Sequence, residues 1–152
     1  MAHTNDKVCL TVVIFLRRGG KVLLANHPKY NAWLPIGGHI DPGEDTDEAL
    51  YREIKEEANL KTEDIKICGE KATIPQGNQR SLLSTPAYVD RHAIQDRDHV
   101  ALVYFGELRE GCEPSLSDEH VELRWFSKDE LANKDGLLKP DIAWYAREAL
   151  RM

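Results

Sequence analysis

Three glutamates within five residues, Glu53, Glu56 and Glu57, are the side chains of this sequence best suited to chemistry. Because an α-helix turns about 100° per residue, Glu56 would lie about 60° to one side of Glu53 and Glu57 about 40° to the other. The three carboxylates would share one stripe, and like charges at these spacings destabilise a bare helix. A cation is therefore expected beside them. Carboxylate oxygens are hard ligands, which favour Mg²⁺, Mn²⁺ or Ca²⁺ over zinc.

The apolar residues of the same segment indicate where this stripe lies. They fall on the adjoining side of the helix and are Leu50, Tyr51, Ile54 and Ala58. Since such a side packs on a sheet, the carboxylates would border the core. The alternative is a solvated acidic face on which Arg52 pairs with Glu56, and the cluster alone leaves that reading open.

The helix that carries the cluster is predicted over Thr46 to Ala58. Asp45 and Glu48 have the spacing of a capping box at its start. Asn59 is suited to a left-handed stop at its end. The segment before it, Trp33 to Gly43, is rich in Gly and Pro and is predicted to be a shaped loop without regular structure.

A longer pattern surrounds the glutamates. Gly38 is followed after five residues by Glu44, and after seven more by Arg52-Glu53. This resembles the Nudix box, a 23-residue signature of the Nudix hydrolase family. The matching positions are Gly38, Glu44, Arg52, Glu53, Ile54, Glu56, Glu57 and Leu60. Asn59 stands where the family has Gly, and because Asn tolerates positive φ, we expect a small cost in stability and intact carboxylates.

The resemblance implies an enzyme that hydrolyses a nucleoside diphosphate linked to another moiety, such as a nucleoside triphosphate, ADP-ribose or a nucleotide sugar. It implies a Mg²⁺ or Mn²⁺ cofactor and small-molecule partners. The implied metal ligands are Gly38 through its carbonyl, Glu53, Glu56, Glu57 and Glu119. Arg52 would orient the carboxylates, Glu44 would support Arg52, and Gly37 with Gly38 would let the backbone approach metal and phosphate.

The residues leave alternatives for two roles, the general base and the side chain that stacks on a nucleobase. We assign the general base to Glu53, with the loop glutamates Glu119 and Glu122 as alternatives. A carboxylate bound to metal is a weaker base, so the sequence alone does not divide the roles of base and metal ligand among these residues. Trp33 and Tyr88 are candidates for stacking on a nucleobase, and core packing is the alternative for both.

The remaining pattern predicts an α/β protein. Expected strands are Val8–Leu16, Val22–Ala25, Ile65–Cys68, Leu82–Val89, His99–Leu108 and Val121–Phe126, with helices after Ser127 and over Asp141–Leu150. The predicted fold is a Nudix-type α/β/α sandwich, a mixed sheet packed between helices, as one domain over residues 1–152.

Composition limits the partners. Twenty basic and 26 acidic residues give a net charge of −6, which argues against binding a nucleic acid polymer or an anionic membrane surface. Three widely spaced cysteines, Cys9, Cys68 and Cys112, predict neither a disulfide framework nor a zinc site. His92 and His99 are interpreted as surface or packing residues. A cytoplasmic protein is expected, and the resemblance makes a homodimer possible.

Other functions compete with hydrolysis. A Nudix fold that binds a nucleotide without cleaving it is the main alternative, although all the glutamates of the box are present. An isomerase of a related fold would need a reactive cysteine in a context that Cys68 and Cys112 do not match. Pro75, about fifteen residues after the box, is weak support for an ADP-ribose-type substrate.

Overall fold

The computed structural model describes residues 8–69, 73–75, 80–116 and 122–152. The strands are β1 (Val8–Arg18), β2 (Lys21–His27), β3 (Ala32–Leu34), β4 (Ile36–His39), β5 (Ile65–Ile67), β6 (Tyr88–Ile94), β7 (Arg97–Leu108) and β8 (Glu122–Ser127). The helices are α1 (Thr46–Ala58), α2 (Lys128–Leu131) and α3 (Pro140–Arg151), with a 3₁₀ turn at Thr62–Asp64. Across these ranges, no helix has the length and apolar character needed to cross a membrane.

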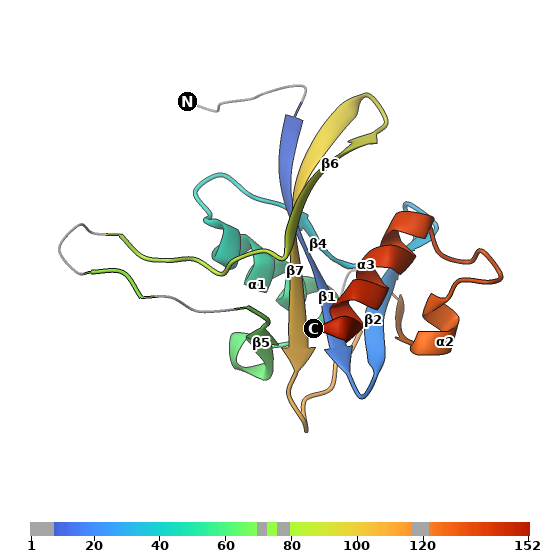
Figure 1. Ribbon diagram of the computed structural model, residues 1–152. Helices are drawn as coiled ribbons and strands as arrows, with labels where there is room; N and C mark the ends of the chain where they lie inside the picture. The colour runs from blue at the N-terminus through green and yellow to red at the C-terminus, as the bar shows by residue number, and fades with distance from the viewer. Residues whose placement is uncertain (1–7, 70–72, 76–79, 117–121) are drawn as a thin grey trace.

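The strands form one mixed sheet, which confirms the predicted fold class. Its main path runs β3-β2-β1-β7-β5, and β4 pairs with β1, β6 with β7 and β8 with β2. The parallel pair β1 and β7 lies at the centre, in register from Val8 opposite Asp98 to Arg17 opposite Glu107. Helices α1 and α3 lie against the sheet in Figure 1.

Successive side chains of β1 point to opposite faces of the sheet, so they contribute to two separate parts of the core. Val12, Ile14 and Leu16 belong to one buried cluster, which includes Leu50, Ile54 and Ala58 of α1. Phe15 belongs to a second buried cluster with Ala143, Ala146 and Ala149 of α3. The helix with the three glutamates and the C-terminal helix therefore cover opposite faces.

The prediction for α1 is confirmed at both ends. Asp45 is the N-cap, and its side chain and that of Glu48 form the predicted capping box. Asn59 adopts the left-handed conformation, with φ 53° and ψ 42°. Its amide Nδ2 also donates to Ser115 Oγ at 3.0 Å, which a glycine at this position would not do.

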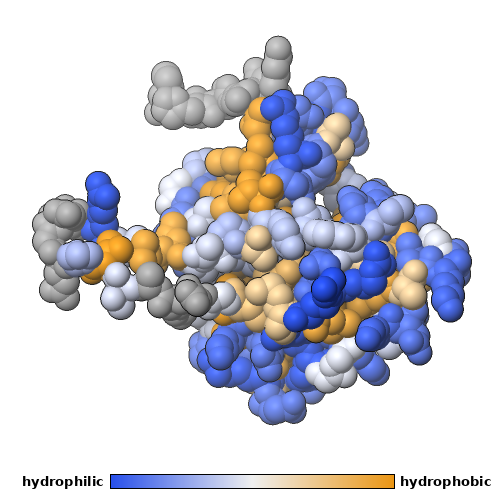
Figure 2. Space-filling model, viewed as in Figure 1, coloured by the Kyte–Doolittle hydropathy of each residue, from blue (hydrophilic) through white to orange (hydrophobic). Residues whose placement is uncertain are grey.

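The prediction of a strand over Leu82–Val89 is wrong for most of its length, because β6 begins only at Tyr88. Ser84 N instead donates to both carboxylate oxygens of Asp47 at 3.1 Å, so this segment is held by α1 rather than by a strand ladder. Leu82 and Leu83 remain exposed, and Figure 2 shows hydrophobic residues along this segment. Apolar residues favoured a strand here, but none of the strands in the described part of the chain pairs with them.

The prediction of an irregular loop over Trp33 to Gly43 is also wrong in part, because β4 and the last two residues of β3 lie within it. Strand β4 pairs antiparallel with β1, with Gly37 opposite Val13 and Gly38 opposite Val12. A Cβ on Gly37 would lie 2.1 Å from the Val12 carbonyl oxygen. Glycine is needed here for close backbone approach within a sheet, which local sequence does not distinguish from a turn.

Candidate active site

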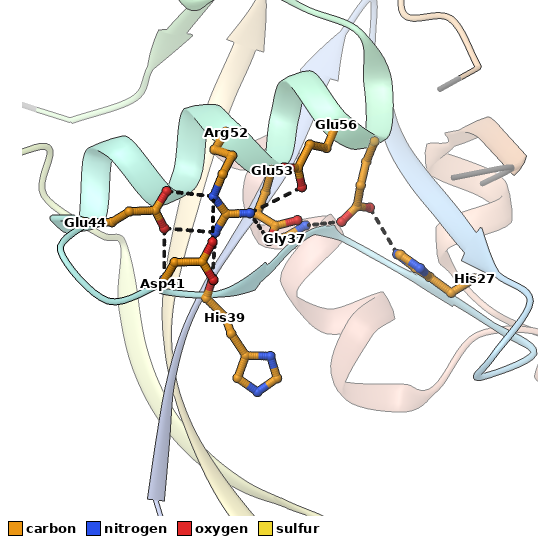
Figure 3. Close-up of polar contacts among 9 residues, drawn as sticks. His27, Gly37, His39, Asp41, Glu44, Arg52, Glu53 and Glu56 are labelled. Atoms are coloured by element: carbon orange, nitrogen blue, oxygen red, sulfur yellow. Dashed lines mark hydrogen bonds and ion pairs between the residues drawn. The ribbon is translucent and has the colours of Figure 1, made fainter. Parts of the chain in front are cut away.

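Arg52 is at the centre of a network that ties helix α1 to the segment before it (Figure 3). Its Nε and Nη2 donate to the two carboxylate oxygens of Glu44 at 2.6 and 2.9 Å. Its Nη1 donates to Glu53 at 2.9 Å and to Glu56 at 3.2 Å. Nη2 also donates to the carbonyl oxygen of His39 at 2.9 Å. One guanidinium therefore positions three carboxylates and the end of β4.

Glu44 supports this network from the loop before α1. The hydrogen bond from Arg52 lowers the pKa of Glu44, and the backbone N–H of Asp41, which donates to Glu44 at 2.8 Å, lowers it further. Because Glu44 accepts hydrogen bonds from both Nε and Nη2 of Arg52, the orientation of the guanidinium plane is fixed as well as its position. Glu44 thus holds Arg52 in place, and its part in the reaction stays a prediction.

Glu53 lies directly beside Gly38. A Cβ at Gly38 would come within 2.4 Å of Glu53 Oε1, so only glycine leaves room for this carboxylate. The pKa of Glu53 is raised to about 7, chiefly by burial and also by the charges of Glu57 and Glu56, while the hydrogen bond and charge of Arg52 oppose the shift. A cation at this position would offset the cost of the negative charge. The hard oxygen donors and the glycine cradle fit a divalent metal ion.

Glu57 is almost completely buried, with 1% of its surface exposed. Its oxygens contact His27 Nε2 at 3.0 Å and accept from the backbone N–H of Gly37 at 3.3 Å. His27 is the last residue of β2, and no sequence motif singles it out. Only the approach of β2 to α1 places this imidazole beside a buried carboxylate.

The structure describes four of the five predicted metal ligands. Gly38, Glu53, Glu56 and Glu57 gather where α1 faces β4. Glu119 lies outside the described residues. Glu122 is exposed at the start of β8, where it pairs with Asn26 of β2.

Trp33 and Tyr88, the two candidates for stacking, both lie against other aromatic rings. The Trp33 ring contacts that of Phe126, with centroids 5.3 Å apart, and packs against the α3-side core. The Tyr88 ring lies 5.4 Å from that of Trp144 and 5.7 Å from that of Tyr145. These contacts correspond to the packing alternative.

A cavity of about 520 Å³ opens beside this network, on the α3 side of the sheet. Its floor is apolar and includes Val13, Phe15, Ala101 and Val103. Gly37, Gly38 and His39 of β4 form the wall nearest the glutamates, and Tyr145 and Ile142 of α3 form another. Gly38 therefore lies both in the cavity wall and beside Glu53, whereas Glu53, Glu56 and Glu57 are not themselves lining residues of the cavity.

Polar residues at one end of the cavity include His39, His92 and His99. The His99 ring lies 5.0 Å from that of His39 and 5.5 Å from that of His92. Burial lowers the pKa of His99, and the charges of His39, His92 and Arg97 lower it further. From the sequence, His92 and His99 are interpreted as surface or packing residues. That His39 lies beside them follows only from the fold, because the three histidines come from different strands.

Comparison with known proteins adds a family. The family model described as "NUDIX domain" matches residues 7–148. The chain is 31% identical over 76 residues to the NAD-capped RNA hydrolase NudC of Mannheimia succiniciproducens, a match that covers 45% of this chain and 28% of that protein. It is 43% identical over 60 residues to the asymmetrical bis(5'-nucleosyl)-tetraphosphatase of Caenorhabditis elegans, covering 37% of this chain and 43% of the other. The matches thus span between a quarter and half of these relatives.

Solved structures match over nearly the whole chain. A NUDIX family hydrolase from Clostridium perfringens has a TM-score of 0.76 and 30% identity, covering 93% of this chain and 95% of that one. A binary complex of the C. elegans Ap4A hydrolase has a TM-score of 0.63 and 25% identity, covering 95% and 93%. The described fold is thus shared with hydrolases of this type.

Proposed function

We propose, from the premise that this chain belongs to the NUDIX family, that it is a divalent-cation-dependent pyrophosphohydrolase. Its substrate would be a nucleoside diphosphate linked to another moiety, cleaved to a nucleoside monophosphate and a phosphorylated remainder. The observation that carries this proposal is the contact of Glu53 with Gly38 beside the Arg52 network, at the wall of a cavity large enough for a nucleoside.

Glu53, Glu56, Glu57 and the Gly38 carbonyl would hold Mg²⁺ or Mn²⁺. When bound, the metal would neutralise the diphosphate and acidify the attacking water. The buried Glu57 is oriented by His27 and by the Gly37 N–H, so its carboxylate would not need to be ordered when a metal binds. Arg52 and Glu44 would keep Glu53 and Glu56 in position on the helix.

The general base stays assigned to Glu53, whose neighbour Gly38 is a lining residue of the cavity. Near-native turnover in Glu53→Gln, together with lost turnover in Glu119→Gln or Glu122→Gln, would transfer the role to the loop. The same three variants therefore separate the two assignments.

The apolar cavity supports a nucleoside-containing substrate, because apolar walls with a few polar groups suit a base and sugar. The names of the relatives include a dinucleoside tetraphosphate and an NAD-capped RNA. An NAD-capped RNA is a nucleic acid polymer, so we no longer exclude nucleic acid polymers as partners of this chain. The homodimer and the cytoplasmic location stay predictions.

The test is hydrolysis of a substrate panel. It contains nucleoside triphosphates, ADP-ribose, nucleotide sugars, dinucleoside polyphosphates and a short NAD-capped RNA, each with Mg²⁺, Mn²⁺ or chelator. We expect metal-dependent cleavage of one class, lost in Glu57→Gln and kept in Glu63→Gln, a change at an exposed glutamate outside α1. If a folded protein bound a nucleotide and cleaved nothing with either metal, the chain would be the sensing module instead.

A further inference from the structure

A second set of possible metal ligands lies away from the glutamates. Ligand atoms of Cys9, His39 and His99 all lie within 4.8 Å of one another. Within the described part of the chain, it is the one such group of three or more Cys, His, Asp or Glu side chains. Cys9 and His39 are 30 residues apart in the sequence and His99 is 60 further, so only the fold brings them together.

The sheet explains how this group forms. Cys9 of β1 is directly opposite His99 of β7 in the parallel register. His39 ends β4, which pairs with β1 at Thr11, two residues after Cys9. Because residues two apart on a strand share a face, Cys9 lies on the face of Thr11 and Val13, which is the cavity side. Three neighbouring strands thus each contribute one ligand to that face.

The group is separate from the carboxylate network, although His39 touches both. In Figure 3 the His39 ring points away from the glutamates, while its carbonyl oxygen accepts from Arg52 at 2.9 Å. The backbone of His39 thus serves one site and its side chain the other. The donor types differ as well, since one set is carboxylate oxygen and the other is thiol and imidazole.

We propose that Cys9, His39 and His99 bind a thiophilic divalent cation of the Zn²⁺ class at the cavity wall. Sulfur and imidazole nitrogen select Zn²⁺, Co²⁺ and similar ions over Mg²⁺. Tetrahedral zinc with bonds of about 2.0 to 2.3 Å places its donor atoms roughly 3.3 to 3.6 Å apart. The three ligand atoms lie within 4.8 Å of one another, so metal binding would need them to approach by side-chain rotation, for which the exposed His39 has room.

Three protein ligands leave one tetrahedral position free. Since His39 and His99 are lining residues of the cavity, the proposed site would lie at its edge. Water or a ligand in the cavity would complete the coordination. The site does not depend on the proposed hydrolysis, because neither Cys9 nor His99 belongs to the Arg52 network.

Cobalt titration tests the proposal. Tag-free full-length protein, reduced and freed of metal, is titrated with Co²⁺ and followed by absorption. We expect one equivalent to give a thiolate-to-cobalt charge-transfer band, which Zn²⁺ abolishes and excess Mg²⁺ does not. The band should vanish in Cys9→Ser, and affinity should fall roughly tenfold or more in His99→Gln.

Matched variants complete the design. Cys68→Ser and Cys112→Ser should keep the band, as should Glu56→Gln, which alters only the carboxylate set. Circular dichroism verifies that each variant is folded, and His99→Gln gives an independent test if Cys9→Ser is not. A band that survives in Cys9→Ser, one that Cys68→Ser or Cys112→Ser removes, or the lack of any saturable thiolate–cobalt band in the wild type would overturn the proposal.

Discussion

Arg52 shows what single residues contribute to the candidate active site. The glutamates could be selected from sequence because their spacing on a helix is local and regular. The bonds of Arg52 to Glu44 and to the His39 carbonyl cross from the helix to the preceding segment. His27, which contacts the buried Glu57, could not be selected, because β2 reaches α1 only in the folded chain.

Replacing Arg52 by lysine tests the value of its geometry. Lysine keeps the positive charge but cannot bond both oxygens of Glu44 while also bonding Glu53. Loss of one charge-assisted hydrogen bond, at about 1.5–3 kcal/mol, predicts a fall in kcat of roughly 10- to 100-fold.

Steady-state kinetics on the substrate identified by the panel measure this effect. Arg151→Lys, a conservative change at the exposed end of α3, is the control and should keep wild-type kcat. Equal rates in Arg52→Lys and wild type would mean that the network has no part in the reaction.

At the scale of the element, helix α1 and strand β4 differ in how far the sequence predicts them. The helix ends are specified locally, by the box of Asp45 with Glu48 and by Asn59 in the left-handed region. Strand β4 is specified by β1, whose backbone lies so close to Gly37 that no side chain fits. From the sequence alone, the glycines of β4 predicted a loop. Only the structure shows that they pair with β1.

The two glycines of β4 should respond differently to alanine. In Gly37→Ala the new Cβ meets the Val12 carbonyl oxygen at 2.1 Å, so the strand pair must shift and the free energy of unfolding should fall by about 2 kcal/mol or more. In Gly38→Ala it meets the Glu53 carboxylate at 2.4 Å, so the side chain must move. Stability should change less, and turnover should fall roughly 10-fold or more because Glu53 is displaced.

Urea unfolding and kcat, measured on both variants, test this contrast. Each variant serves as the control for the other. Full activity in Gly38→Ala would mean that the position of the Glu53 carboxylate does not matter for turnover, which contradicts its proposed role.

At the scale of the molecule, the cavity forms because α3 is joined to the sheet opposite α1. Tyr145 of α3 donates its phenol O–H to Asp90 of β6 at 2.5 Å. The two clusters of core residues were implied by the apolar periodicity of strands and helices. The cavity between α3 and the sheet could not be predicted from that periodicity, because its lining residues come from segments throughout the chain.

The Tyr145–Asp90 bond gives a pH-dependent prediction. Burial raises the pKa of Tyr145, and the Asp90 carboxylate raises it further. Below pH of about 10 the phenol is protonated in both folded and unfolded chains, so the bond contributes fully there. Above that pH the unfolded chain loses the proton first, and this contribution falls as pH rises.

Unfolding of Tyr145→Phe by urea from pH 7 to 11 measures this contribution. We expect the variant to be less stable by about 1–2 kcal/mol near pH 8, with the difference shrinking above pH of about 10. Tyr30→Phe, at an exposed tyrosine, is the control. A difference between wild type and Tyr145→Phe that stayed constant up to pH 11 would contradict this account.

The central claim is that the carboxylates of α1 support metal-dependent hydrolysis. The most direct measurement is the Mg²⁺ dependence of kcat for wild type, Glu56→Gln and Glu63→Gln on the substrate found in the panel. Because Glu56 is partly exposed, its replacement should leave the protein folded. The account predicts that Glu56→Gln lowers kcat at least roughly 10-fold and requires more Mg²⁺, while Glu63→Gln matches wild type. Wild-type turnover and Mg²⁺ dependence in Glu56→Gln would contradict it.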